Sequence, residues 1–136
     1  MNILFYCPFK FSLESKNIKS LGGIESLNLE LTQYLANSKN KIYLASFCNK
    51  EFKKKNLINL PISKLKRDSY NYNFDYIVSS NDPNIFDLFR NSKKILWIHN
   101  TLAIEKAFRK KKLLSILKNK ITAVFVSKYL ESKTSN

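Results

Sequence analysis

The backbone groups best placed to bind a ligand in this chain are those of two adjacent glycines. Gly22 and Gly23 are the only glycines among its 136 residues, and a helical pattern starts directly after them. Glycine is favoured where the backbone takes a positive φ or where another group approaches closely. A helix N-terminus also offers N–H groups and partial positive charge to an anion. The pair predicts a cradle for a phosphate or sugar group, and a plain turn before a helix is the alternative interpretation.

The second candidate is His99, the only histidine of the chain. It ends an apolar run and is followed by Asn100 and Thr101, which extend a polar patch. An imidazole donates or accepts hydrogen bonds near neutral pH, so His99 could act at a reacting centre. A hydrogen-bonded core histidine at a strand end is the alternative.

The apolar patterns predict the elements that position these residues. Strands are expected at residues 3–7, 41–47, 75–80, 94–99 and 121–127, and helices at residues 24–35, 84–90, 104–117 and from 128 to 133. The first helix carries its apolar residues at helical spacing, namely Ile24, Leu27, Leu31, Tyr34 and Leu35. Residues 49–74 show little pattern apart from a short edge strand at 57–62 that contains Pro61.

Strands that alternate with helices predict an α/β fold, a Rossmann-like three-layer parallel sheet with helices on both faces. We expect one domain over residues 1–136. Ligands of such sheets bind at the carboxyl ends of the strands. The loop after Cys7, Ser80-Asn81, His99-Asn100 and Ser127 should therefore share one edge, where the glycine pair and the histidine face the same cleft.

The composition excludes several classes of protein. No apolar run approaches the about 18 residues of a membrane-spanning helix. Residues 2–7 lack the basic leader and cleavage site of a secretion signal, so a cytoplasmic location is expected. Cys7 and Cys48 have no zinc-like spacing, which predicts reduced structural thiols and no metal site.

The formal net charge of +14 constrains the partners only weakly. The basic residues of 53–55, 64–67 and 109–112 are interpreted as solvated faces, and contact with anionic lipid is the alternative. Nucleic acid is disfavoured, because no binding motif organises the tyrosines near residues 70–76.

Several of these segments, taken in order, resemble a known family. They are Leu21-Gly22-Gly23-Ile24-Glu25, residues 75–80, Trp97-Ile98-His99-Asn100 and residues 126–130, where Ser127 ends a strand before a helix. Together they resemble the amino-terminal half of a GT-B glycosyltransferase of family 4. Members of this family are retaining enzymes that use nucleotide-activated sugars, and the resemblance spans residues 2–130.

The resemblance implies that the domain binds a glycan or glycolipid acceptor, with a nucleotide-sugar as co-substrate and no other cofactor. Gly22 and Gly23 would present N–H groups near the donor diphosphate, and His99 would lie near the donor sugar as the catalytic residue. Asn100 and Ser127 would contribute to the donor-phosphate or acceptor site. The choice of acceptor would lie in residues 8–21 and 49–74.

A complete member of the family has a second, donor-binding domain with an E-x7-E signature, which these 136 residues do not contain. We therefore expect a truncated or split glycosyltransferase for polysaccharide biosynthesis, inactive until a carboxy-terminal domain or partner chain completes it. Its expected location is cytoplasmic, with peripheral contact at the inner face of the membrane. The alternative is a non-catalytic basic α/β module that docks on anionic membrane or on a partner subunit.

Overall fold

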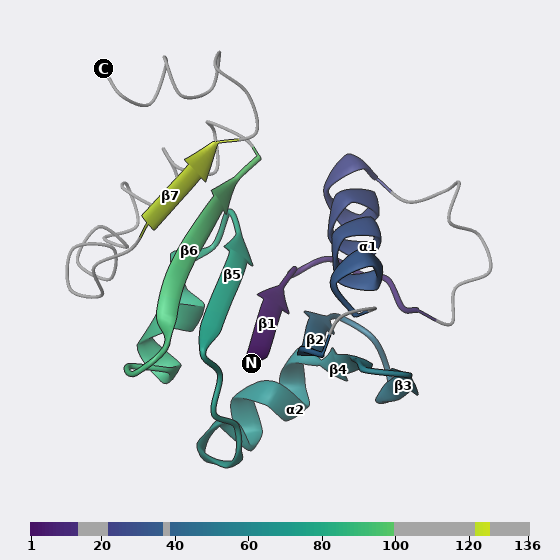
Figure 1. Cartoon of the computed structure of the whole chain (residues 1–136), viewed down its shortest axis with the longest axis horizontal. Coiled ribbons are helices and arrows are strands. Elements are labelled where there is room, and N and C mark those ends of the chain that lie inside the picture. The colour runs from purple at the N-terminus through teal and green to yellow at the C-terminus, as the bar shows by residue number, and fades with distance from the viewer. Residues whose placement is uncertain (14–21, 37–38, 100–121, 126–136) are drawn as a thin grey trace.

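The computed structural model describes residues 1–13, 22–36, 39–99 and 122–125, which form one sheet covered by helices (Figure 1). The strand order is β3-β4-β2-β1-β5-β6-β7. Every neighbouring pair is parallel except β3 and β4. From the central β1 the chain adds strands on one side and then crosses to the other. This topology is consistent with a Rossmann-like α/β fold.

The strands are β1 (Asn2–Tyr6), β2 (Lys41–Ser46), β3 (Phe52–Lys54), β4 (Leu57–Pro61), β5 (Tyr76–Ser80), β6 (Lys93–Ile98) and β7 (Thr122–Phe125). The helices are α1 (Gly23–Leu35) and α2 (Ile62–Arg67), with short 3₁₀ helices η2 (Ser69–Asn71) and η3 (Pro83–Leu88). The predicted strands at 41–47, 75–80 and 94–99 are confirmed to within a residue or two at each end. The predicted helices at 104–117 and 128–133 lie outside the described residues.

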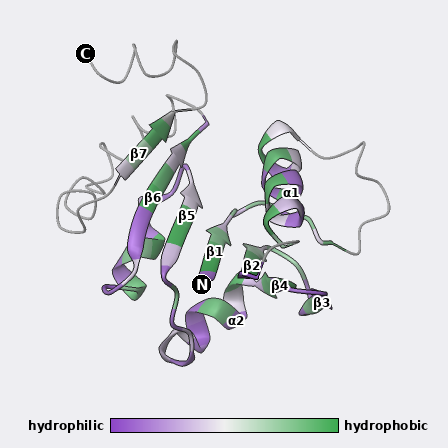
Figure 2. Ribbon diagram, viewed as in Figure 1, coloured by the Kyte–Doolittle hydropathy of each residue, from purple (hydrophilic) through white to green (hydrophobic). Residues whose placement is uncertain are grey.

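The core lies on both faces of the sheet, because successive strand residues point to opposite sides. Leu4 and Tyr6 of β1 join a buried cluster that includes residues of α2 and η3. Phe5 and Cys7 join a second cluster, under α1. Figure 2 shows hydrophobic residues along the strands, with a hydrophilic stretch on β6, and both hydrophobic and hydrophilic residues on α1. The predicted layers on both faces are thus present in the described part of the chain.

The buried face of α1 differs from the predicted one. Leu27 is 38% exposed and Tyr34 is 75% exposed, although their spacing in the sequence predicts that both lie on the buried, apolar face of the helix. The fully buried residues of the helix include Asn28 and Thr32. Asn28 faces the sheet and hydrogen-bonds Ser80 of β5, and Ile24, Leu31 and Leu35 are partly buried against the cluster.

The segment at residues 49–74 is more regular than its sequence suggests. The predicted strand at 57–62 is present as β4, but its predicted place at the edge of the sheet is wrong. β4 lies inside the sheet, because β3 pairs with it in an antiparallel hairpin. Lys55 makes the tight turn with a φ of 55°. Pro61 is tolerated because it ends β4 and directly precedes α2, where its missing N–H removes no helical hydrogen bond.

The predicted helix at 84–90 is the 3₁₀ helix η3. Asp82 caps it, since Asp82 Oδ1 accepts the Asn84 N–H at 3.0 Å. Cys7 and Cys48 are both free, and Cys7 is buried. Within the described ranges, no helix has the length and apolar character needed to cross a membrane.

Candidate functional site

The candidate site lies where the chain changes direction across the sheet, between β1 and β5. Ligands of open α/β sheets bind at such a switch point, outside the carboxyl ends of the strands. Cys7 follows β1, Ser80 ends β5 and His99 follows β6. Since these strands are parallel neighbours, the three residues share one edge.

Ser80 connects helix α1 to His99. Its Oγ accepts a hydrogen bond from Asn28 Nδ2 at 2.9 Å and lies 3.1 Å from His99 Nε2. Ser80 is 1% exposed and Asn28 is fully buried. Asn28 Nδ2 also donates to the Ile24 carbonyl at 2.9 Å, which fixes the amide orientation. The first turns of α1 are therefore held against the imidazole through one serine.

Asn81 and Trp97 position His99 from its own side of the sheet. Asn81 has a φ of 61°, a conformation that asparagine tolerates better than most residues. Its Oδ1 accepts the His99 N–H at 2.7 Å, and its own N–H donates to the Trp97 carbonyl at 2.9 Å. The Trp97 and His99 ring centres are 4.3 Å apart. The histidine is thus held by its backbone, its Nε2 and its ring.

Burial sets the protonation of the site. It lowers the pKa of His99 to about 4, so the imidazole is neutral at neutral pH and has one donor and one acceptor nitrogen. Burial, with the Glu25 carboxylate as a smaller cause, raises the pKa of the Cys7 thiol to about 12. Cys7 is therefore a neutral thiol beside Ser80 and no nucleophile. The site suits uncharged hydrogen bonding, such as that to a hydroxyl group.

One buried acceptor of this site has no partner among the residues that the structure describes. It is Asn28 Oδ1. Buried polar groups are nearly always hydrogen-bonded, and the exceptions occur at functional sites among other places. The orphaned oxygen lies on α1, on the residue that reaches Ser80.

The glycine pair begins α1, as expected, but of the two predicted reasons for glycine there, a positive φ and close approach of another group, the positive φ is wrong. Gly22 is the N-cap with a φ of −69°, and neither glycine has a positive φ. Glu25 Oε2 accepts the Gly22 N–H at 2.6 Å. A Cβ on Gly22 would meet only the flexible Glu25 carboxylate, and a Cβ on Gly23 would meet no described atom within 4 Å. The folded chain therefore does not require glycine at residue 23.

We predict that Gly23→Ala raises the free energy of unfolding by about 0.5 kcal/mol. Alanine fits the helical backbone and reduces the freedom of the unfolded chain. Urea unfolding measures the change. Gly22→Ala is the matched control and should give no gain, because its Cβ displaces the Glu25 carboxylate. A loss above about 1 kcal/mol for Gly23→Ala would show that the fold itself needs this glycine.

The remaining predicted site residues, Asn100 and Ser127, lie outside the described residues. The glycine pair and His99 are linked through Asn28, which lies on the first turns of α1. The sequence patterns do not single out Asn28 as a site residue, although its position between Ile24 and Leu31 places a polar residue on the apolar stripe of the helix. In the described part of the chain, no three His, Cys, Asp or Glu residues gather as a metal site would need.

Comparison with protein-family models, with curated proteins and with solved structures found no match for this chain. No family is assigned to the chain by likeness.

Proposed function

We propose that this chain is the acceptor-side half of a retaining GT-B glycosyltransferase that resembles family 4. Completed by a donor-binding domain, it would transfer a sugar from a nucleotide-sugar to a glycan or glycolipid. The observation that carries the proposal is the Asn28–Ser80–His99 connection, which holds the first turns of α1 against a neutral imidazole at the switch point.

The two ends of this connection suit two parts of the donor, the diphosphate at α1 and the sugar at His99. A nucleoside diphosphate leaving group gains negative charge, and the N-terminus of α1 supplies N–H groups that stabilise it. Glu25 already binds the Gly22 N–H, so a phosphate has to displace this carboxylate or bind beside it. No described atom lies within 4 Å of where a Gly23 Cβ would stand, and among the described residues this leaves room for a phosphate to approach the backbone.

His99 suits the sugar side of the cleft. Because its pKa is lowered to about 4, it is neutral and hydrogen-bonds a sugar hydroxyl without carrying a charge. In this proposal His99 orients the donor sugar and helps to organise the transition state. Ser80 and Asn81 are positioning residues, since they act through the histidine.

The proposal predicts that donor binding changes the fluorescence of Trp97, the only tryptophan of the chain, whose ring lies beside His99. Titration of the whole chain with UDP-glucose should give a change in emission that saturates only at high ligand concentration, because in this proposal the donor-binding domain supplies most of the contacts with the donor. His99→Gln and Gly23→Ala should each weaken binding several-fold, although we expect Gly23→Ala to stabilise the fold.

Two controls make this test decisive. Tyr70→Phe, at an exposed residue on η2, should bind like the wild type. Glucose alone, without the diphosphate, should bind more weakly than UDP-glucose. Emission that does not respond to UDP-glucose, or equal binding by the wild type, His99→Gln and Gly23→Ala, would refute the proposal.

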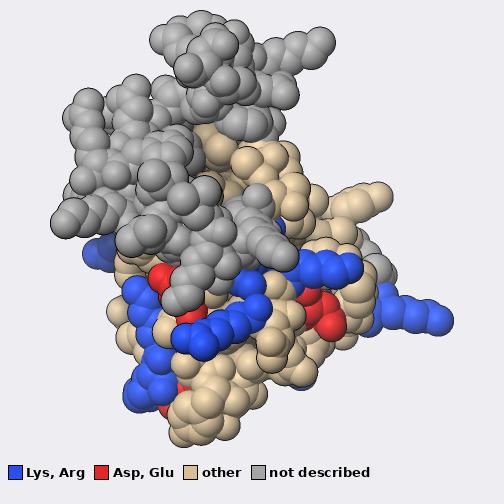
Figure 3. All heavy atoms as spheres, turned by 90° about the vertical axis from the view of Figure 1, so that its left-hand side faces the viewer, with Lys and Arg blue, Asp and Glu red and all other residues tan. Residues whose placement is uncertain are grey.

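Docking on an anionic membrane is the second proposal, and the charge of +14 favours it. Figure 3 shows Lys and Arg side chains outnumbering Asp and Glu side chains on the face it presents. The basic run at residues 109–112 lies outside the described residues. This module would bind anionic vesicles in a salt-sensitive way without any change at Trp97.

A further inference from the structure

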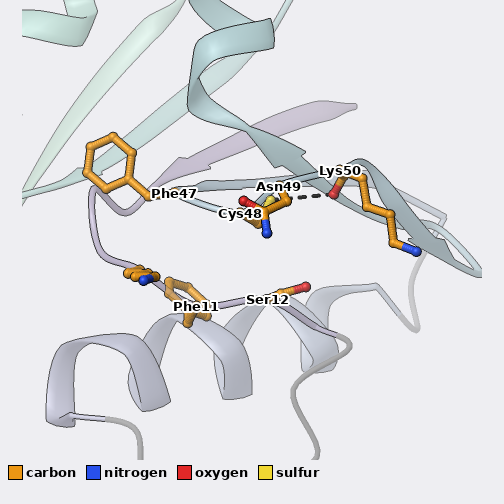
Figure 4. A pocket seen from close by; sticks show the side chains of 7 residues that line it. Phe11, Ser12, Phe47, Cys48, Asn49 and Lys50 are labelled. Carbon is orange, nitrogen blue, oxygen red and sulfur yellow. Dashed lines mark hydrogen bonds between the residues drawn. The ribbon is translucent and has the colours of Figure 1, made fainter.

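A pocket of ≈ 620 Å³ lies at the carboxyl ends of β1 and β2. Figure 4 shows Phe47, Cys48, Asn49 and Lys50 along one side of it and Phe11 and Ser12 along the other, and Lys10 completes the lining. It lies on the same edge of the sheet as His99, but β2 and β6 are three strand spacings apart, or about 14 Å. The pocket is therefore separate from the Ser80–His99 site.

Buried polar groups hold the two sides of the pocket in place. Ser46 Oγ donates to the Phe11 carbonyl at 2.7 Å, and the Phe47 N–H donates to the Phe9 carbonyl at 3.0 Å. Farther along the same loop, Asn59 Oδ1 accepts the Leu13 N–H at 2.9 Å. The pocket is thus preformed, as small-molecule sites usually are.

The lining combines an exposed aromatic ring, an amide and ammonium groups. Phe47 is 53% exposed, whereas Phe11 is buried beneath the pocket at 6%. An adjoining pocket of ≈ 360 Å³ shares Phe47, Cys48 and Asn49 and adds Lys66 of α2. Lys10 and Lys50 belong to the first pocket, and the described residues that line the two pockets include no acidic residue. An exposed ring beside cations suits a ligand with a weakly polar face and a negative charge.

We infer that this pocket binds a phosphorylated sugar, with the sugar ring against Phe47 and the phosphate near the lysines. The Asn49 amide would hydrogen-bond the hydroxyls. A single exposed ion pair is weak, so the three lysines matter as a group. The ligand is either a soluble sugar phosphate or the headgroup of a glycolipid.

The inference rests on the proposed function and names the acceptor class for it. β2, which leads into the pocket, and β6, which leads to His99, are about 14 Å apart by the strand spacing, and a ligand that reaches both sites has to span this gap. A single sugar ring does not cover that distance. The acceptor would be an anionic glycan of more than one sugar, bound by its phosphorylated end in the pocket.

The test is a titration of the whole chain with glucose 1-phosphate, followed by NMR at the backbone amides of Ser12, Asn49 and Lys50. Phosphatidylinositol vesicles form a second arm, in which cosedimentation measures binding. Removing Lys10 and Lys50 together, as Lys10→Gln with Lys50→Gln, should weaken binding about 10- to 25-fold, at about three- to fivefold per lysine. Phe47→Ala should weaken it about three- to tenfold.

Matched controls separate the pocket from the overall charge. Lys53→Gln with Lys54→Gln removes the same charge from the exposed β3, and Tyr70→Ala removes a ring that is 82% exposed. Both should bind like the wild type. Pocket-dependent binding of glucose 1-phosphate supports a soluble ligand, and pocket-dependent binding of vesicles alone supports a lipid headgroup.

Three results would overturn the inference: no binding in either arm, equal loss in the pocket and control variants, or inorganic phosphate binding as tightly as glucose 1-phosphate. Failure of the proposed function is distinguishable, because Trp97 emission reports on His99 and the pocket amides do not. If the chain binds glucose 1-phosphate in the pocket but does not respond to UDP-glucose, the inference about the pocket stands and the proposed sugar transfer fails.

Discussion

Replacing Asn59 by leucine should lower the free energy of unfolding by about 3 kcal/mol. Asn59 is fully buried in β4. Its Nδ2 donates to the Leu44 carbonyl at 2.8 Å and to Ser46 Oγ at 3.0 Å, and its Oδ1 accepts the Leu13 N–H. Leucine has a similar volume but satisfies none of these groups. Each lost hydrogen bond costs about 1 kcal/mol, and a stranded buried donor costs more.

Urea unfolding of the wild type and of Asn59→Leu measures this loss. Asn2→Leu in β1 is the matched control, because Asn2 Nδ2 makes one exposed hydrogen bond, at 3.3 Å to the Asn73 carbonyl. We expect the control to change stability by less than about 0.5 kcal/mol. In Asn59→Leu the loop after β1 should also lose its anchor at Leu13, so the NMR signals of Phe11 and Ser12 should shift. Equal losses in the two variants would contradict this role of Asn59.

Asn59 also illustrates what the sequence could not reveal about the fold. Solid apolar runs predicted the strands at 41–47 and 75–80, because parallel strands are buried on both faces. The position of β4 depends instead on its pairing with β3, through a turn of Lys55 and Asn56 in which the positive φ falls on the lysine and not on the asparagine. In the sequence Pro61 favours an edge strand, yet in the structure it is the last residue of β4, which lies inside the sheet.

The candidate site was predictable in its location and less so in its contacts. The rule for parallel sheets brings Ser80 and His99 to one edge, and the structure confirms that they meet. Asn28 contacts Ser80 across 52 residues of sequence, which periodicity does not reveal. The glycine pair stands out in the sequence because the chain has no other glycine, but no positive φ explains the use of glycine at these two residues. Any role in close approach by a ligand remains a prediction, which Gly23→Ala tests.

The stability of the protein should fall by about 1–2 kcal/mol as the pH drops from 6.5 to about 4, because of His99. Burial lowers the pKa of this imidazole to about 4, from an ordinary value of 6.5 in the unfolded chain. The unfolded state therefore takes up the proton first. The contribution of the neutral His99 to the free energy of unfolding is complete above pH 6.5 and is lost as the pH falls from 6.5 through the pKa of the folded protein. Each unit of difference is worth about 1.4 kcal/mol, but the imidazole is partly exposed and water solvates part of its charge.

The measurement compares urea unfolding of the wild type and of His99→Gln across this pH range. All other ionisable groups are common to the two proteins, so their contributions cancel in the difference between the two curves. The difference in the free energy of unfolding between the wild type and His99→Gln should decline only below pH 6.5. In the folded protein, Trp97 emission should follow the imidazole directly, since the two ring centres are 4.3 Å apart. An emission midpoint near 4 shows that the site holds His99 neutral, as the proposed contact with a sugar hydroxyl requires. A midpoint near 6.5 would mean that Ser80 and the surrounding sheet do not shield the ring, and the proposed role of His99 would lose its physical basis.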